Sequence, residues 1–308
     1  MYANQIIFRI AFTIVLLFPH LNCSNGVNKA HKFILVVMDG ARYTETLGST
    51  SGTMYTPNIS QRIVPVSCKA GNIFNKGATR TVPGHTALST GFYEDLANDG
   101  SEVPSNPSFM HLFVQLHPDS DKVWLVTSKN KLSVLASVRS GPFTPVKYSC
   151  GYQGTTRDDA LTFAEAKRIM DAYAPDVMFI SFMEPDVSGH SGIWSDYLAA
   201  ITRTDALIGK LFDYINADPD YAGRTDLIIA NDHGRHSDGV NGGFSGHGCT
   251  CEGCEHIMCV AYGPDFKKGY ASDNEYQQVD IPATSAYLLG LSIPGSEGKV
   301  IREFLLRE

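Results

Sequence analysis

The sequence has no broadly basic region and no apolar run long enough to cross a bilayer. Lysine and arginine number 25 against 32 aspartates and glutamates, which gives the 308-residue chain a formal net charge of −7. Proteins that bind nucleic-acid polymers usually present a wide basic face, and this composition argues against one. We therefore expect any phosphate-binding site to be local, and we expect no nucleic-acid polymer among its partners.

The apolar stretch near the N-terminus is short. Residues 10–18 are apolar, Arg9 precedes them, and Pro19 and small residues around Cys23 follow. Because a membrane-spanning helix needs about 20 apolar residues, this pattern predicts a cleaved signal peptide over residues 1–23 rather than a permanent anchor. Residues 24–308 are then expected to form one folded domain of a secreted, periplasmic or extracellular protein without a stable membrane anchor.

Cysteine is scarce but clustered. The chain has seven cysteines, and six lie beyond the presumed signal peptide: Cys68, Cys150, Cys249, Cys251, Cys254 and Cys259. The C-x-C-x-x-C run could hold a structural zinc ion. Because a signal peptide indicates an oxidising compartment, we expect disulfides instead, which would hold the loop around His247 in place.

Three apolar, β-branched runs divide the chain, at residues 33–38, 177–182 and 227–230. Continuous runs of this kind are typical of buried strands in a parallel sheet. Residues 158–173 and 195–217 carry apolar residues near helical spacing and are expected to pack on the sheet faces. The sequence predicts an α/β fold, a three-layer sandwich with a mainly parallel central sheet.

Acidic residues follow all three predicted strands. Asp39 and Asp232 come directly after the first and third runs, and Asp186 follows the second after a short turn. In open α/β sheets, ligands bind beyond the carboxyl ends of the strands. The three carboxylates should therefore converge in space.

Histidines accompany these carboxylates. His190 lies four residues after Asp186, His233 directly follows Asp232, and His247 stands between two glycines. Each pattern is weak alone, but together they form a set made only of Asp and His. Imidazole and carboxylate ligands together favour zinc over manganese or iron.

A candidate nucleophile lies in the string T-R-T-V-P-G-H-T-A-L at residues 79–88. The chain resembles the alkaline phosphatase superfamily, most closely its nucleotide pyrophosphatase/phosphodiesterase and related phosphatase branches, in which a T-x-P-x-H string opens a helix with Thr as nucleophile. That Thr is Thr81 here. The resemblance continues in V-V-M-D-G at 36–40, E-P-D-V-S-G-H at 184–190, N-D-H-G at 231–234, H-G at 247–248 and A-Y-G-P at 261–264.

The resemblance implies an alkaline phosphatase-like catalytic domain with two divalent metal ions, expected to be Zn²⁺, and a phosphothreonine intermediate on Thr81. It assigns one ion to Asp186, His190 and His247, and the other to Asp39, Thr81, Asp232 and His233. Sulfatases share the fold but carry a C/S-x-P-x-R string, which Thr81 and His85 do not match. We expect His85 to lie behind the nucleophile turn, His236 to lie at the rim or surface, and His256 to be a weaker alternative to His247 as third ligand.

The substrate class depends on groups that contact the remaining phosphate oxygens. Lys129 and Lys131 resemble a Lys-x-Arg motif of phosphate-monoesterase members, with Lys131 in place of Arg, and Asn98 matches an Asn that donates to a phosphate oxygen. We expect a phosphomonoesterase that acts on a small-molecule phosphoester. A phosphodiesterase or nucleotide pyrophosphatase is the alternative, and a secreted metal-binding degenerate family member is the non-enzymatic one, although no ligand or nucleophile is lost.

Overall fold

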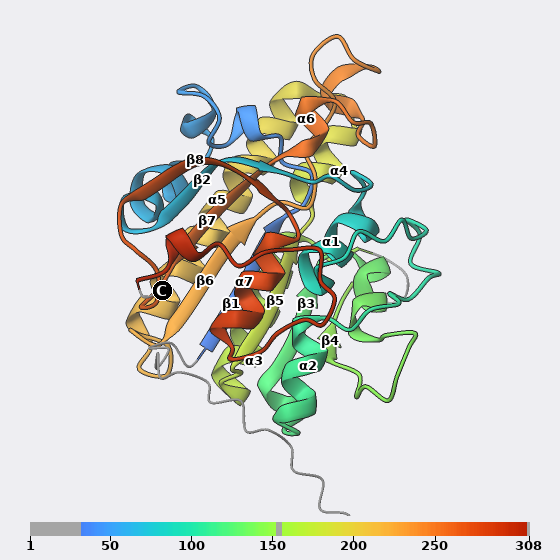
Figure 1. The fold of residues 1–308 in the computed structure, drawn as a ribbon. Helices are drawn as coiled ribbons and strands as arrows, with labels where there is room; N and C mark the ends of the chain where they lie inside the picture. The colour runs from blue at the N-terminus through green and yellow to red at the C-terminus, as the bar shows by residue number, and fades with distance from the viewer. Residues whose placement is uncertain (1–31, 152–155, 307–308) are drawn as a thin grey trace, which may run out of the picture.

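The computed structural model describes residues 32–151 and 156–306, so the predicted signal peptide at 1–23 lies outside the described residues. The strands are β1 (Lys32–Met38), β2 (Cys68–Phe74), β3 (Val123–Thr127), β4 (Lys147–Ser149), β5 (Val177–Phe182), β6 (Thr225–Ala230), β7 (His256–Tyr262) and β8 (Tyr270–Gln277). The helices are α1 (Thr81–Thr90), α2 (Phe109–Leu116), α3 (Asp159–Tyr173), α4 (Glu184–His190), α5 (Trp194–Ala217), α6 (Glu252–Glu255) and α7 (Asp280–Leu288), arranged as Figure 1 shows.

The strands form one eight-stranded sheet in the order β4-β3-β5-β1-β6-β7-β2-β8. The three strands expected from the sequence are neighbours at its centre, where Val36 of β1 pairs with Ile180 of β5 and Ile229 of β6, both in parallel. Strand β7 runs antiparallel to both of its neighbours. The prediction of a mainly parallel central sheet is confirmed.

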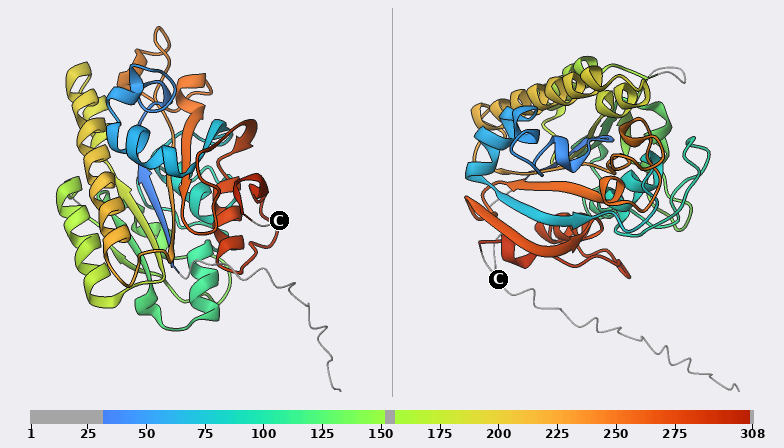
Figure 2. Two further views of the ribbon diagram at one scale, coloured as in Figure 1. Left: turned by 90° about the vertical axis from the view of Figure 1, so that its left-hand side faces the viewer. Right: turned by 90° about the horizontal axis from the view of Figure 1, so that it is seen from above.

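Alternate side chains of β1 enter two separate cores. Leu35 and Val37 pack in a core with residues of α1, α2 and α7, whereas Val36 and Met38 pack in a second core with residues of α3 and α5. Figure 2 shows α3 and α5 on one side of the sheet and α2 and α7 on the other. The predicted three-layer sandwich is therefore confirmed, and both faces of the central strands are buried, as continuous apolar runs require.

The two helices expected from periodicity are present with boundaries close to those predicted. Helix α3 starts where the Asp158 carboxylate accepts a hydrogen bond of 2.7 Å from the Leu161 N–H, a standard N-cap, and it ends before Ala174 at φ 43°. In the part of the chain that the structure describes, no helix has the length and apolarity to span a membrane.

Asp226, near the amino end of β6 and remote from the strand ends that carry the acidic loops, is fully buried. Burial and the nearby Asp265 carboxylate raise the pKa of Asp226 well above its usual value. The native state therefore binds this proton more tightly than the unfolded chain, and the native state loses stability as the pH rises through this range.

We expect Asp226→Asn to stabilise the fold at neutral pH by about 1–3 kcal/mol, the usual cost of a buried, incompletely paired polar group. The amide can keep a hydrogen bond to Asp265 without carrying a charge. The free energy of unfolding, measured by urea denaturation of both proteins, should diverge as the pH rises above about 4. Equal stability of the two proteins at all pH values would show that this carboxyl is not perturbed.

Candidate active site

The loops after β1, β5 and β6 meet at the carboxyl edge of the sheet. Asp39 follows β1, Asp186 lies in the first turn of α4 after β5, and Asp232 follows β6. Gly40 adopts φ +69°, its N–H donates to Asp232 Oδ1 at 3.1 Å, and an added Cβ would lie 2.7 Å from the Asp186 Cβ. Only glycine fits this position, and its closeness to both carboxylates holds the three loops together.

The first predicted ligand set is assembled. Asp186 Oδ1 lies 3.3 Å from His190 Nε2 and 3.4 Å from His247 Nε2, and the two imidazole nitrogens are 3.2 Å apart. The carboxylate and one imidazole come from α4, and the other imidazole comes from the loop after β6. The side chain of His190 is 49% exposed, so the site opens to solvent on this side.

The second set lies beside the first and is fully buried. His233 Nε2 is 3.2 Å from Asp232 Oδ2 and 3.7 Å from Asp39 Oδ1. Ligand atoms of Asp39, Asp186 and His233 also lie within 4.8 Å of one another. The two sets therefore adjoin through Asp186, the arrangement that a pair of neighbouring cations needs.

The donor atoms have the chemistry of a metal centre. His233, His190 and His247 each direct Nδ1 at a backbone carbonyl oxygen, at 2.8, 3.1 and 3.0 Å, so Nδ1 carries the hydrogen and Nε2 presents its lone pair. Among the described residues, His233 Nε2, Asp39 Oδ1 and Asp232 Oδ2 are buried without a hydrogen-bond partner. Burial lowers the pKa of His233 to about 3, which keeps it in the neutral form that a metal requires. The residues fit a dinuclear site of divalent ions.

Thr81 is the first residue of α1, and the Lys129 amine links it to Asp39 and Asp186 of the two ligand sets. Its side chain is 1% exposed, and its Oγ1 accepts from Lys129 Nζ at 3.3 Å. The next N–H, of Val82, donates to Asn98 Oδ1 at 2.9 Å. The predicted nucleophile and two of the predicted substrate-binding residues therefore lie together.

Lys129 is the central cation of the site. Its Nζ lies 2.7 Å from Asp39 Oδ2, in ion-pair contact, and 2.6 Å from Asp186 Oδ2. Burial alone would lower the pKa of Lys129, but the Asp39 and Asp186 carboxylates outweigh it and raise the pKa, so the amine is charged. Lys131 Nζ donates to the Asn98 backbone oxygen at 3.0 Å and to its Oδ1 at 3.3 Å, which leaves the Asn98 amide nitrogen as the donor end.

His85 lies behind the nucleophile turn, as expected. It is fully buried, with Nδ1 2.8 Å from the Thr81 backbone oxygen and Nε2 2.8 Å from Ser181 Oγ. Its Nδ1 is also 3.1 Å from Asp232 Oδ2. Both nitrogens are therefore engaged, and His85 positions the start of α1 against β5 and the Asp232 loop.

Two expectations about other residues are wrong. His236, expected at the rim, is 7% exposed and lies against the sulfur atoms of the cysteine cluster. The expected disulfides are absent, since all six cysteines of the described residues are free: Cys68, Cys150, Cys249, Cys251, Cys254 and Cys259. The physical reason at the cluster is that the sulfurs of Cys249, Cys251 and Cys254 converge on one imidazole nitrogen instead of pairing with one another.

His256 stacks on Tyr43 and directs Nε2 at the Gly71 oxygen, away from the ligand sets.

Arg235 is a functional residue that the sequence patterns did not single out. It follows the N-D-H-G string, is fully buried, and donates from Nη1 to Asp186 Oδ1 at 2.6 Å and from Nη2 to the Ser245 oxygen at 3.0 Å. A Cβ on Gly189 would lie 2.5 Å from its guanidinium carbon, so that glycine makes room for it. The signal available in the sequence was its place two residues after His233, next to two predicted ligands.

We expect Arg235→Ala to lower zinc affinity or activity by about 10–100-fold, the usual effect of losing a residue that orients a metal ligand. The Asp186 carboxylate would lose the donor to its Oδ1 and keep the Lys129 contact at its Oδ2. Zinc titration of kcat/KM measures the effect, and excess zinc should restore part of the activity. Arg235→Lys keeps the charge but cannot contact Asp186 and the Ser245 oxygen at the same time. Its zinc affinity and activity should lie between those of the wild-type protein and Arg235→Ala. Unchanged zinc dependence in both variants would exclude this positioning role.

Comparison with known proteins agrees with the fold and with a metal centre. A family model described as Metalloenzyme superfamily matches residues 143–293. The chain is 24% identical to GPI ethanolamine phosphate transferase 1 of Mus musculus, over 86% of this chain and 32% of that protein, and 25% identical to its namesake in Schizosaccharomyces pombe, over 97% and 36%. The chain thus spans about a third of the length of these curated relatives.

Solved structures share the architecture. A protein in the alkaline phosphatase superfamily from Vibrio parahaemolyticus has a TM-score of 0.65 at 17% identity, over 91% of this chain and 71% of that one. Murine ectonucleotide pyrophosphatase/phosphodiesterase 5 has a TM-score of 0.64 at 16% identity, over 89% and 100%. The resemblance predicted from the T-x-P-x-H and D-H-G strings is confirmed as an alkaline phosphatase-like fold.

Proposed function

We propose that this chain, which has an alkaline phosphatase-like fold and a metalloenzyme family match, is a metal-dependent phosphoester hydrolase with Thr81 as nucleophile. The observation that carries the proposal is the position of the buried Thr81 hydroxyl, 3.3 Å from Lys129 Nζ, which also contacts Asp39 and Asp186 of the two ligand sets. A binding protein without activity would not need a buried hydroxyl at this point. Metal binding without turnover would favour the alternative of a metal-binding family member that has lost its activity.

The reaction proposed is a double displacement. Thr81 Oγ1 attacks phosphorus as the bond to the leaving alcohol breaks, and water then attacks the phosphothreonine and returns Thr81 Oγ1 to its hydroxyl form. The charged Lys129 amine beside Thr81 Oγ1 and the Asn98 amide nitrogen would stabilise the phosphoryl charge in both steps. Two divalent ions, expected to be Zn²⁺ and held by the two ligand sets, would lower the pKa of the hydroxyl and neutralise charge on phosphorus oxygens.

The charge around the site favours a phosphate monoester. Lys129 Nζ contacts the Thr81 hydroxyl. Lys131 contacts Asn98, whose side-chain oxygen accepts from the N–H of Val82, the residue after Thr81. A monoester dianion offers more negative oxygen to these groups than a diester monoanion does, and charge-assisted hydrogen bonds are the strong ones. We therefore propose a small-molecule phosphomonoester as the substrate class.

We expect Lys129→Met to lower kcat/KM for a monoester by about 10–100-fold, the loss of one charge-assisted hydrogen bond, and to lower it less for a matched diester. The ratio of the two kcat/KM values is the measurement, because a general folding defect lowers both equally. Glu275→Met, a change on the exposed side of β8, serves as the control. An unchanged ratio of the two kcat/KM values would show that Lys129 does not discriminate between the monoester dianion and the diester monoanion.

The proposal is tested by comparing kcat/KM of the zinc-loaded protein for an aryl phosphate monoester and the matched aryl phosphate diester. A preference for the monoester supports the proposal. A preference for the diester would move the activity to the phosphodiesterase or nucleotide pyrophosphatase class, and no turnover of either would contradict it.

Group transfer is the second candidate, favoured by alignments that extend over 86% and 97% of this chain with proteins named as phosphoethanolamine transferases. The first step would be the same, with a substituted phosphoryl group on Thr81, and an acceptor alcohol would replace water in the second. Adding increasing concentrations of an alcohol during turnover distinguishes the two. Transfer product that exceeds hydrolysis product would identify a transferase.

The proposed location is outside the cytosol, because the pattern at residues 1–23 is typical of a cleaved leader. N-terminal sequencing of protein collected from the medium or the periplasm tests this. A mature chain that starts near residue 24 agrees with it, and an intact leader on cytosolic protein contradicts it.

A further inference from the structure

We propose a third metal site, separate from the two ligand sets of the active site, in which His236, Cys249, Cys251 and Cys254 bind one Zn²⁺ ion with a structural role. The four ligand atoms all lie within 4.8 Å of one another. None of the four belongs to the catalytic sets. The inference stands independently of the reaction that the chain catalyses.

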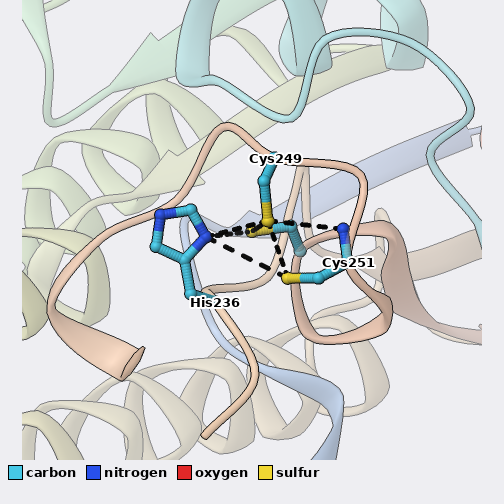
Figure 3. Close-up of side chains that lie close together, drawn as sticks. His236, Cys249 and Cys251 are labelled. Carbon is cyan, nitrogen blue, oxygen red and sulfur yellow. Dashed lines mark hydrogen bonds between the residues drawn. The ribbon is translucent and has the colours of Figure 1, made fainter. Parts of the chain in front are cut away.

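The geometry is convergent. His236 Nδ1 lies 3.0 Å from Cys249 Sγ, 3.2 Å from Cys254 Sγ and 4.0 Å from Cys251 Sγ. The Cys249 sulfur is 2.8 Å from that of Cys251 and 3.7 Å from that of Cys254. Figure 3 shows the imidazole and the sulfurs of Cys249 and Cys251 directed at one point. One imidazole and three thiols around one point form the Cys₃His set of structural zinc sites.

The surroundings suit thiolates. The Ser237 N–H donates to Cys251 Sγ at 3.4 Å, and the Cys251 N–H donates to Cys249 Sγ at 3.3 Å. Cys254 and His236 are buried, and the other two are half-buried. Donors aimed at sulfur stabilise negative charge there, whereas a disulfide would use only two of the three sulfurs and leave the imidazole without a role.

The backbone of the proposed zinc site contacts the segments that carry His247, Thr81 and His233. The Cys249 backbone oxygen accepts from Thr79 Oγ1 at 2.9 Å, and the Thr79 oxygen in turn accepts from His247 Nδ1 at 3.0 Å. The Cys254 oxygen accepts from the Gly234 N–H at 2.8 Å, next to His233. An ion here would fix the His247 loop, the start of the nucleophile string and the D-H-G turn relative to one another.

The test is metal content and cobalt spectroscopy on the full chain. We expect about three zinc ions per chain, of which a mercurial thiol reagent releases one. Protein loaded with Co²⁺ should show the intense near-ultraviolet absorption of a thiolate–cobalt bond, which the catalytic sets cannot produce because they contain no cysteine. Both measurements use the wild-type protein, so they do not depend on whether a variant folds.

Substitutions of the proposed ligands then test whether the third zinc ion and the thiolate–cobalt absorption come from this cluster. Cys254→Ser and His236→Ala should each lower zinc content by about one ion and weaken or abolish the thiolate absorption, while Cys150→Ser, a free cysteine outside the cluster, should change neither. Two zinc ions per chain with no thiolate absorption, or a disulfide between any two of the three cysteines mapped in native protein, would overturn the proposal. Such a result would leave the proposed hydrolase untouched, because its metals and nucleophile are measured separately.

Discussion

Replacing Thr81 with alanine is expected to lower kcat/KM by at least about 10⁴-fold while the zinc content stays unchanged. In the proposed mechanism the Thr81 hydroxyl oxygen forms the covalent bond to phosphorus, and its loss leaves only water to attack. The change removes only a hydroxyl and a methyl group from this buried side chain, so the vacated space is small. Steady-state kinetics and metal analysis on the same preparation measure both parts of the prediction.

Two controls separate chemistry from packing. Thr81→Ser keeps a hydroxyl and should retain measurable activity. Thr90→Ala makes the same change at the other end of α1, where Oγ1 donates to the Thr86 oxygen at 2.8 Å, and should leave kcat/KM nearly unchanged. An alanine variant at 81 that keeps most of its activity would mean that another group attacks phosphorus.

Removing metal with a chelator is expected to abolish activity, by at least about 10³-fold, and to lower the melting temperature. The reason for the second effect is charge. Asp39, Asp186 and Asp232 are nearly or fully buried, and among the lysines and arginines of the described residues, Lys129 and Arg235 contact Asp39 or Asp186. Added zinc should restore both properties, and chelator saturated with zinc beforehand should change neither. Activity that survives exhaustive chelation would contradict the metal mechanism.

The matched variant for this prediction is Asp39→Asn. It keeps the shape of the side chain but removes the charge that a cation needs, so zinc binding at the second set should weaken. Asp238→Asn, at a residue whose side chain is 88% exposed, is the control. Equal zinc affinity in the two variants would remove Asp39 from the ligand set.

The centre of the fold could be predicted because its sequence signals are strong. Strands β1, β5 and β6 are buried on both faces, which requires the continuous apolar runs that were visible in the sequence. Their carboxyl ends meet because they are neighbours in a parallel arrangement, so Asp39, Asp186 and Asp232 were expected together. Strand β8, in contrast, is an edge strand with mostly exposed polar residues, and its pattern gives little indication of a strand.

The parts of the site that escaped prediction depend on contacts between distant segments. Arg235 reaches Asp186 across 49 residues of sequence. Lys129 was predicted to contact the substrate phosphate, but its ion pairs with Asp39 and Asp186 were not predicted. No local spacing encodes such contacts. The cysteines were expected to pair because of the leader, but the position of His236 beside Cys249 and its neighbours depends on how two loops fold onto each other.

The proposed phosphoryl group on Thr81 is detected by acid quenching of the zinc-loaded enzyme during turnover of a labelled monoester, followed by mass spectrometry of the digested chain. We expect phosphate on Thr81 in the wild-type protein and none in Thr81→Ala. Turnover without any covalent phosphate, or phosphate on a different residue, would contradict it.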